Sequence, residues 1–62
     1  MPPLTGKDMI IILKKNGWVK HSQKGSHHHF TKDGIKIPVP IHGNKDLPKG
    51  TEQQILKKAG LR

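Results

Sequence analysis

The chain has 62 residues, no cysteine and a formal charge of +8 at pH 7. The lack of cysteine excludes disulfides and thiolate zinc sites, and no apolar run approaches the ~20 residues that a membrane span needs. We therefore expect one domain over residues 1–62, soluble and cytoplasmic, whose basic surface favours nucleic acid or an acidic protein.

Acidic residues are few and scattered. They are Asp8, Asp33, Asp46 and Glu52, whereas lysine and arginine together number twelve. No two of them are close neighbours in the sequence, so the chain offers few ligands for a nuclease that binds metal through a cluster of carboxylates.

The N-terminal part of the sequence predicts a helix over residues 6–15. Thr5 can cap this helix, and Asp8 at the third helical position completes a variant of the capping box. Gly17 stands where a left-handed residue commonly ends a helix. The best inward-facing stripe consists of Met9, Ile12 and Leu13. Ile11 points away from that stripe, and we expect it to be at least partly exposed.

Three short strands are predicted after the helix. They cover residues 18–23, 27–31 and 35–41, with turns at Gly25-Ser26 and Lys32-Asp33-Gly34. Pro38 and Pro40 share the outward parity of the third strand and cannot donate backbone hydrogen bonds. The third strand should therefore lie at an edge of the sheet.

The last predicted element is a second helix that begins after Thr51. Thr51 would cap it, Gln54 would complete a capping box, and Gly60 would end it. The order of elements is then αβββα, an α+β fold. It predicts a three-stranded antiparallel sheet with both helices on one face, which is the plan of the double-stranded-RNA-binding domain.

The stretch with the most side chains that could take part in catalysis is Lys24-Gly25-Ser26-His27-His28-His29-Phe30. Because side chains alternate between the faces of a strand, His28 should share the core side with Phe30. His27 and His29 should then lie on the opposite, helix-free face.

Three interpretations of the histidines remain open. His27 and His29, joined by His42, could bind a metal, although no cysteine or carboxylate lies nearby to complete a zinc site. His28 and His29 could be purely structural. His27 could act as a general acid or base in RNA cleavage, with Lys24 or the backbone N–H groups of the turn stabilising charge on the phosphate.

Other basic residues are candidates for binding RNA rather than cleaving it. The candidates for phosphate contacts are Lys20, Lys24, Lys36 and Lys45. Phosphate contacts position RNA without reading its sequence, and a merely solvated cationic surface is the alternative for each lysine. His42 could contact phosphate or assist His27, or it could be a solvated loop residue.

The chain resembles the HicA toxins of HicA–HicB toxin–antitoxin systems, also described as YcfA-like mRNA interferases. The resemblance covers nearly the whole chain, in order and at the family's spacing. The matching stretches are Asn16-Gly17-Trp18-Val19, Gln23 to Phe30, Ile37-Pro38-Val39-Pro40-x-His42, Lys45-x-Leu47-x-x-Gly50-Thr51, and Ile55 to Gly60.

This resemblance implies a fold like that of double-stranded-RNA-binding domains and cleavage of mRNA without a metal or other cofactor. The family's catalytic residue is the histidine directly after Gly-Ser, which is His27 here. We expect support from Lys24, Gly25 and Ser26, and His29 or His42 could be a second proton-transfer group. The resemblance also implies a HicB-like antitoxin that covers the histidine and blocks access of RNA.

Three other functions compete with an RNA-cleaving toxin. The first is a binding module for double-stranded RNA that has no catalytic activity. The second is an interaction protein whose basic face serves only an acidic protein partner. The third is a zinc-dependent nuclease, which a chelator would inactivate.

Overall fold

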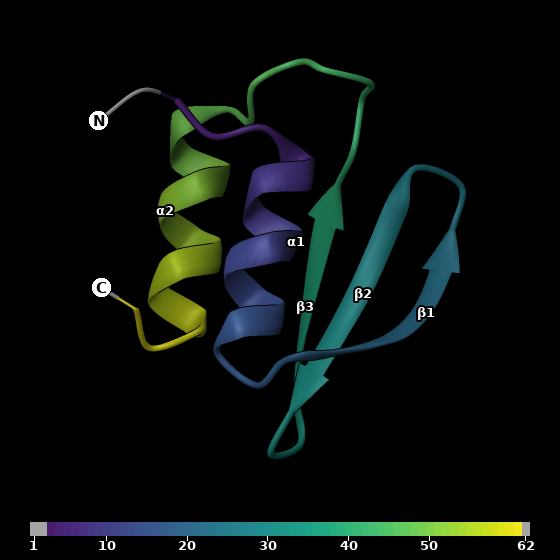
Figure 1. Cartoon of the computed structure of the whole chain (residues 1–62), viewed down its shortest axis with the longest axis vertical. Coiled ribbons are helices and arrows are strands. Elements are labelled where there is room, and N and C mark those ends of the chain that lie inside the picture. Colours follow the sequence, from purple (N-terminus) through teal and green to yellow (C-terminus); the bar gives the residue numbers. More distant parts are fainter. Residues whose placement is uncertain (1–2, 62) are drawn as a thin grey trace.

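The computed structural model describes residues 3–61 and contains two helices and one three-stranded sheet (Figure 1). The elements are α1 (Gly6–Lys15), β1 (Val19–Lys24), β2 (His27–Lys32), β3 (Ile35–Pro40) and α2 (Lys49–Lys58). The strands are antiparallel and lie in the order β1-β2-β3, with the helices side by side on one face. The predicted αβββα fold is confirmed, whereas the predicted domain over residues 1–62 extends beyond the described part at both ends. No helix within residues 3–61 is long and apolar enough to cross a bilayer.

Helix α1 begins and ends as its sequence predicts. The Asp8 N–H donates to the Thr5 hydroxyl, and the Thr5 N–H donates to the Asp8 carboxylate, both at 3.1 Å. At the other end Gly17 has a φ of 88°, and the Trp18 N–H donates to the Leu13 carbonyl at 3.0 Å. These bonds satisfy backbone groups that have no partner inside the helix, which explains why a ten-residue helix has sharp ends.

Both hairpins have two-residue turns with positive φ angles. Gly25 has a φ of 59° and Ser26 is not in the positive region, the φ pattern of a type II′ turn. Asp33 and Gly34 both have positive φ, at 52° and 81°, as a type I′ turn requires. The strand bounds differ from those predicted by about a residue at several ends, and Lys32 belongs to β2 rather than to the turn.

The predicted start of the second helix was wrong. Helix α2 begins at Lys49, its cap is Pro48, and no side chain caps it. The Pro48 carbonyl accepts the N–H of Glu52 at 2.9 Å, so the helical ladder is already established before Thr51 could cap it. Proline suits this place because it has no N–H of its own to satisfy. The predicted end is confirmed, since Gly60 has a φ of 73° and the Leu61 N–H reaches the Leu56 carbonyl at 2.9 Å.

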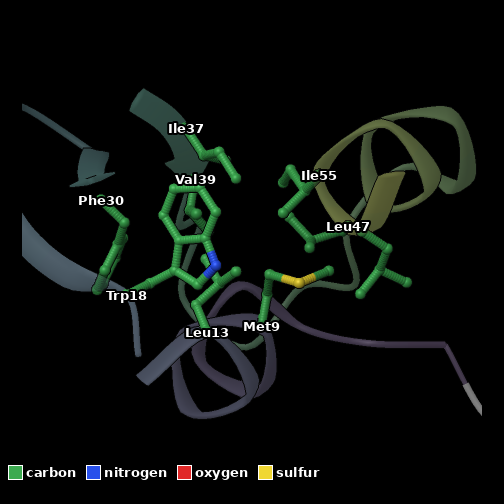
Figure 2. Packing of buried hydrophobic residues seen from close by; sticks show 9 residues of the cluster. Met9, Leu13, Trp18, Phe30, Ile37, Val39, Leu47 and Ile55 are labelled. Atoms are coloured by element: carbon green, nitrogen blue, oxygen red, sulfur yellow. The ribbon is translucent and has the colours of Figure 1, made fainter. Parts of the chain in front are cut away.

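The core lies between the two helices and the helix-facing side of the sheet (Figure 2). The buried residues are Met9, Leu13, Trp18, Phe30, Ile37, Val39, Leu47, Ile55 and Leu56. Figure 2 shows Ile37 and Val39 of β3 facing Met9 and Leu13 of α1 and Ile55 of α2. Both helices contact β3, and Ile11 of α1 is 53% exposed, as predicted.

The first turn of α1 packs closely against the end of β3. Gly6 is buried, and a Cβ atom at this position would lie 2.7 Å from the Pro40 carbonyl oxygen and 2.9 Å from Ile41 Cγ1. The Ile41 N–H in turn donates to the Ser26 carbonyl at 2.8 Å. This chain of contacts fixes the end of the sheet where β2 begins.

Candidate active site

His27 is the first residue of β2, directly after the Gly25-Ser26 turn. In the sheet it lies opposite Lys24 of β1 on one side and opposite Pro40 of β3 on the other. Its side chain is exposed. The hairpin therefore brings together four of the residues that the sequence singled out, namely Lys24, Gly25, Ser26 and His27.

The hydrogen bond between Ile41 and Ser26 sets how closely His27 packs on β3. Because hydrogen-bonded and non-hydrogen-bonded pairs alternate along an antiparallel ladder, the next pair, His27 and Pro40, is a non-hydrogen-bonded one. Side chains in such pairs approach each other more closely than in hydrogen-bonded pairs. The side chain of His27 therefore lies beside that of Pro40.

A pocket of about 350 Å³ opens beside His27, between the free edge of β3 and helix α2. Its lining residues are His27, Ile37, Pro38, Pro40, Thr51, Gln54, Ile55 and Lys58. The alternation that separates His27 from the core is confirmed, but its placement on a helix-free surface needs correction. At the edge of the sheet the pocket joins His27 to α2.

Sequence reasoning missed the helical side of this pocket. Thr51, Gln54 and Lys58 are spaced i, i+3 and i+7, so they form one stripe on α2. This stripe adjoins the buried Ile55, a pattern that helical periodicity could have revealed. Periodicity alone does not show which strand the stripe faces.

The other candidate histidines take different positions. His29 is half-buried and lies opposite Ser22 and Pro38, on the same face of the sheet as His27. His42 is exposed in the loop after β3 and does not line the His27 pocket. Within residues 3–61 no group of three or more His, Asp or Glu side chains is arranged to hold a metal ion.

The predicted phosphate-binding lysines do not form a single surface. Lys24 lies beside His27, whereas Lys36 is on the same face near the opposite end of the sheet. Lys45 is exposed in a turn, where its N–H donates to the His42 carbonyl at 3.1 Å. Lys20 pairs with Phe30 and therefore points to the other face. On the helical side of the pocket, Lys58 supplies a charge that was not predicted.

A comparison with protein families gives this site its context. The family model for the HicA toxin of bacterial toxin–antitoxin systems matches residues 6–61. The chain belongs to the HicA toxin family. Among the curated proteins compared with it, none matches. The matched range includes all five elements and every residue of the His27 pocket, and a toxin of this kind implies an antitoxin partner.

His28 of this toxin lies on the other face from His27, and its environment disfavours the charged imidazolium. Burial lowers the pKa of His28 below its ordinary value, and the nearby Lys20 ammonium lowers it further. His28 pairs with Val39, a core residue, so its ring lies at the margin of the core. We assign His28 a structural role, as a neutral half-buried side chain.

The shift at His28 predicts how stability depends on pH. Above about pH 6.5 both the folded and the unfolded chain hold this ring neutral. Below it the unfolded chain takes up the proton first, so the free energy of unfolding decreases until the pH passes the folded-state pKa. In urea titrations from about pH 7.5 to about pH 5, His28→Gln should lose stability less steeply than the wild type. His21→Gln, at an exposed position of β1, is the control, and equal slopes for the two variants would refute the assignment.

Proposed function

We propose that this toxin is a metal-independent endoribonuclease that cleaves mRNA, with His27 as its catalytic residue. The observation that carries the proposal is the exposed His27 at a tight turn, beside Lys24 and at the wall of a pocket, in a chain of the HicA family. An exposed imidazole with a nearby ammonium can reach both a ribose hydroxyl and its phosphate. Cleavage of mRNA in the cytoplasm would stop translation and growth, as expected of a toxin.

The reaction that suits a single imidazole is internal transesterification of RNA. The 2′-hydroxyl oxygen attacks the adjacent phosphorus and forms a P–O2′ bond, while the P–O5′ bond breaks. A neutral imidazole at His27 can accept the 2′-hydroxyl proton, or an imidazolium can donate a proton to the leaving 5′-oxygen. The products are a 2′,3′-cyclic phosphate and a 5′-hydroxyl, and the balance requires no water, metal or other co-reactant.

The neighbours of His27 suit the charge that develops on the phosphate. Lys24 pairs with His27 across the hairpin and can bring its ammonium to the phosphate, and the turn backbone at Gly25 and Ser26 offers N–H groups near the same point. His29, two residues along the same face, and His42, in the loop beyond β3, are the candidates for the second proton transfer. Lys36 and Lys45 would add phosphate contacts, and Lys20, on the other face, would contribute only to the overall positive field.

A toxin with an exposed catalytic group must be neutralised until it is needed. We propose a HicB-like antitoxin that covers His27 and so denies RNA access to the turn and the pocket. The net charge of +8 suits such a partner if it is acidic.

The test is cleavage of a long unstructured RNA by the full chain in excess chelator, with analysis of the fragment ends. We expect cleavage that the chelator leaves unchanged, with 2′,3′-cyclic phosphate and 5′-hydroxyl ends. RNA that is bound but intact would instead establish the non-catalytic binding module. Cleavage that disappears with chelator would establish a metal-dependent nuclease.

A further inference from the structure

We propose that the pocket between β3 and α2 is a nucleotide subsite that holds one base of a single-stranded RNA next to the cleaved phosphate. In this subsite Gln54 determines which base is preferred. The inference rests on the proposed ribonuclease function for the class of its ligand. Its evidence is the chemistry of the pocket walls, the form of the β3 edge and the distribution of charge.

The pocket combines apolar walls with a few polar groups, as ligand sites in proteins usually do. The apolar walls are the side chains of Ile37, Pro38, Pro40 and Ile55. Thr51 and Gln54 add a hydroxyl and an amide from α2, and the volume of about 350 Å³ lies within the range of small-ligand sites. A planar base can lie against the proline and isoleucine surfaces while its edge meets these polar groups.

Gln54 is the group best able to distinguish bases. Its amide offers both donors and an acceptor, so it can form paired hydrogen bonds with a base edge, whereas the Thr51 hydroxyl accommodates either partner. Gln54 is exposed, so its amide is accessible to a ligand in the pocket. A good pair of such bonds separates the right base from the wrong one by about tenfold or more.

The edge of β3 favours RNA over a protein strand as the occupant. Because the Ile41 N–H points toward β2, the backbone of Pro38 and Pro40 points the other way, to the free edge. Neither proline has an N–H, so a peptide strand added here would find two donors missing. The prolines leave ring surfaces at this edge in place of hydrogen-bond donors, which suits a base and not a β-strand.

The charges near the pocket also suit a polyanion. Lys58 lines the pocket, and a neighbouring hollow of about 530 Å³ is lined by Gln54, Lys57 and Lys58. Among the residues that the structure describes, no acidic side chain lines either hollow. Since His27 forms part of the pocket wall, a base bound there would place a flanking phosphate at His27, and Lys57 and Lys58 would meet the next phosphates along α2.

The test separates binding from cleavage by using the full chain with His27→Ala. Its dissociation constants for fluorescent oligo(A), oligo(C) and oligo(U) hexamers would be measured by anisotropy. In this background, the further substitution Gln54→Ala should reduce the ratio of affinities between the best-bound and the worst-bound hexamer by about tenfold. Gln53→Ala, also exposed and on α2 but outside the pocket, is the matched control and should leave that ratio unchanged.

The two proposals can fail separately. A chain with His27 intact that binds RNA but never cleaves it, while base preference still depends on Gln54, would overturn the ribonuclease function and support the subsite. Equal base preference for Gln54→Ala and Gln53→Ala, with circular dichroism matching the parent, would overturn the subsite. The subsite proposal would then be wrong, whether the pocket binds nothing or binds a segment of the antitoxin.

Discussion

Replacing His27 with alanine is expected to lower kcat/KM for RNA cleavage by about 10²–10⁴-fold, the usual contribution of a general acid or base. The free energy of unfolding should change by no more than about 0.5 kcal/mol, because His27 is exposed and lies outside the core. The effect should fall on the chemical step, so kcat should decrease more than the affinity for RNA. Single-turnover cleavage and urea denaturation of the same preparation measure both quantities.

His21→Ala is the matched control for this variant. His21 is also an exposed histidine of the same sheet, but it lies at the irregularity in the pairing of β1 with β2 and away from the turn. Its loss removes the same side chain and should leave the cleavage rate within about twofold. An equal decrease for both variants would mean that the histidines act through general charge or stability, and His27 would then have no specific role in proton transfer.

Gly6→Ala is expected to destabilise the toxin by about 1–3 kcal/mol, although alanine is the better helix former. The added Cβ would lie 2.7 Å from the Pro40 carbonyl oxygen, which is backbone and cannot rotate away. Relief requires α1 to move from the end of β3, and this shift would also disturb the Ile41–Ser26 hydrogen bond next to His27. We therefore expect a lower melting temperature, by about 4–8 °C per kcal/mol, together with a lower cleavage rate.

Gly50→Ala offers a contrasting control on the other helix. Gly50 lies in the first turn of α2, and a Cβ there would meet nothing within 4 Å. This substitution should be neutral or stabilising by up to about 1 kcal/mol, because it reduces the freedom of the unfolded chain. If Gly6→Ala were as stable as Gly50→Ala, the close approach of α1 to β3 would not be a feature of the folded toxin.

The features that were predictable from sequence are those with local causes. The capping box of Thr5 and Asp8 and the stop at Gly17 depend on residues within one turn of each other. Strand alternation similarly separated His27 from Phe30 before any packing was known. The turn that presents His27 is also local, since Gly25 alone supplies its positive φ.

The features that were not predictable depend on packing or on competing local signals. Local chemistry favours Thr51 as the cap, because its hydroxyl can accept a backbone N–H, yet the helix begins at Lys49 without a side-chain cap and packs on β3. The close contact of Gly6 with Pro40 appears only when α1 lies on the sheet. The pocket likewise forms only when α2 meets the edge of β3, so Gln54 and Lys58 had no visible link to His27.

Proton transfer by the imidazole of His27 during RNA cleavage is central to the proposed function. Its most direct test is single-turnover cleavage by folded His27→Ala with increasing concentrations of free imidazole, corrected for cleavage by imidazole without protein. We predict a nearly inactive variant whose rate rises with imidazole, because the added base can enter the space beside Pro40. A His27→Ala chain that cleaves RNA at the wild-type rate without imidazole would contradict this role.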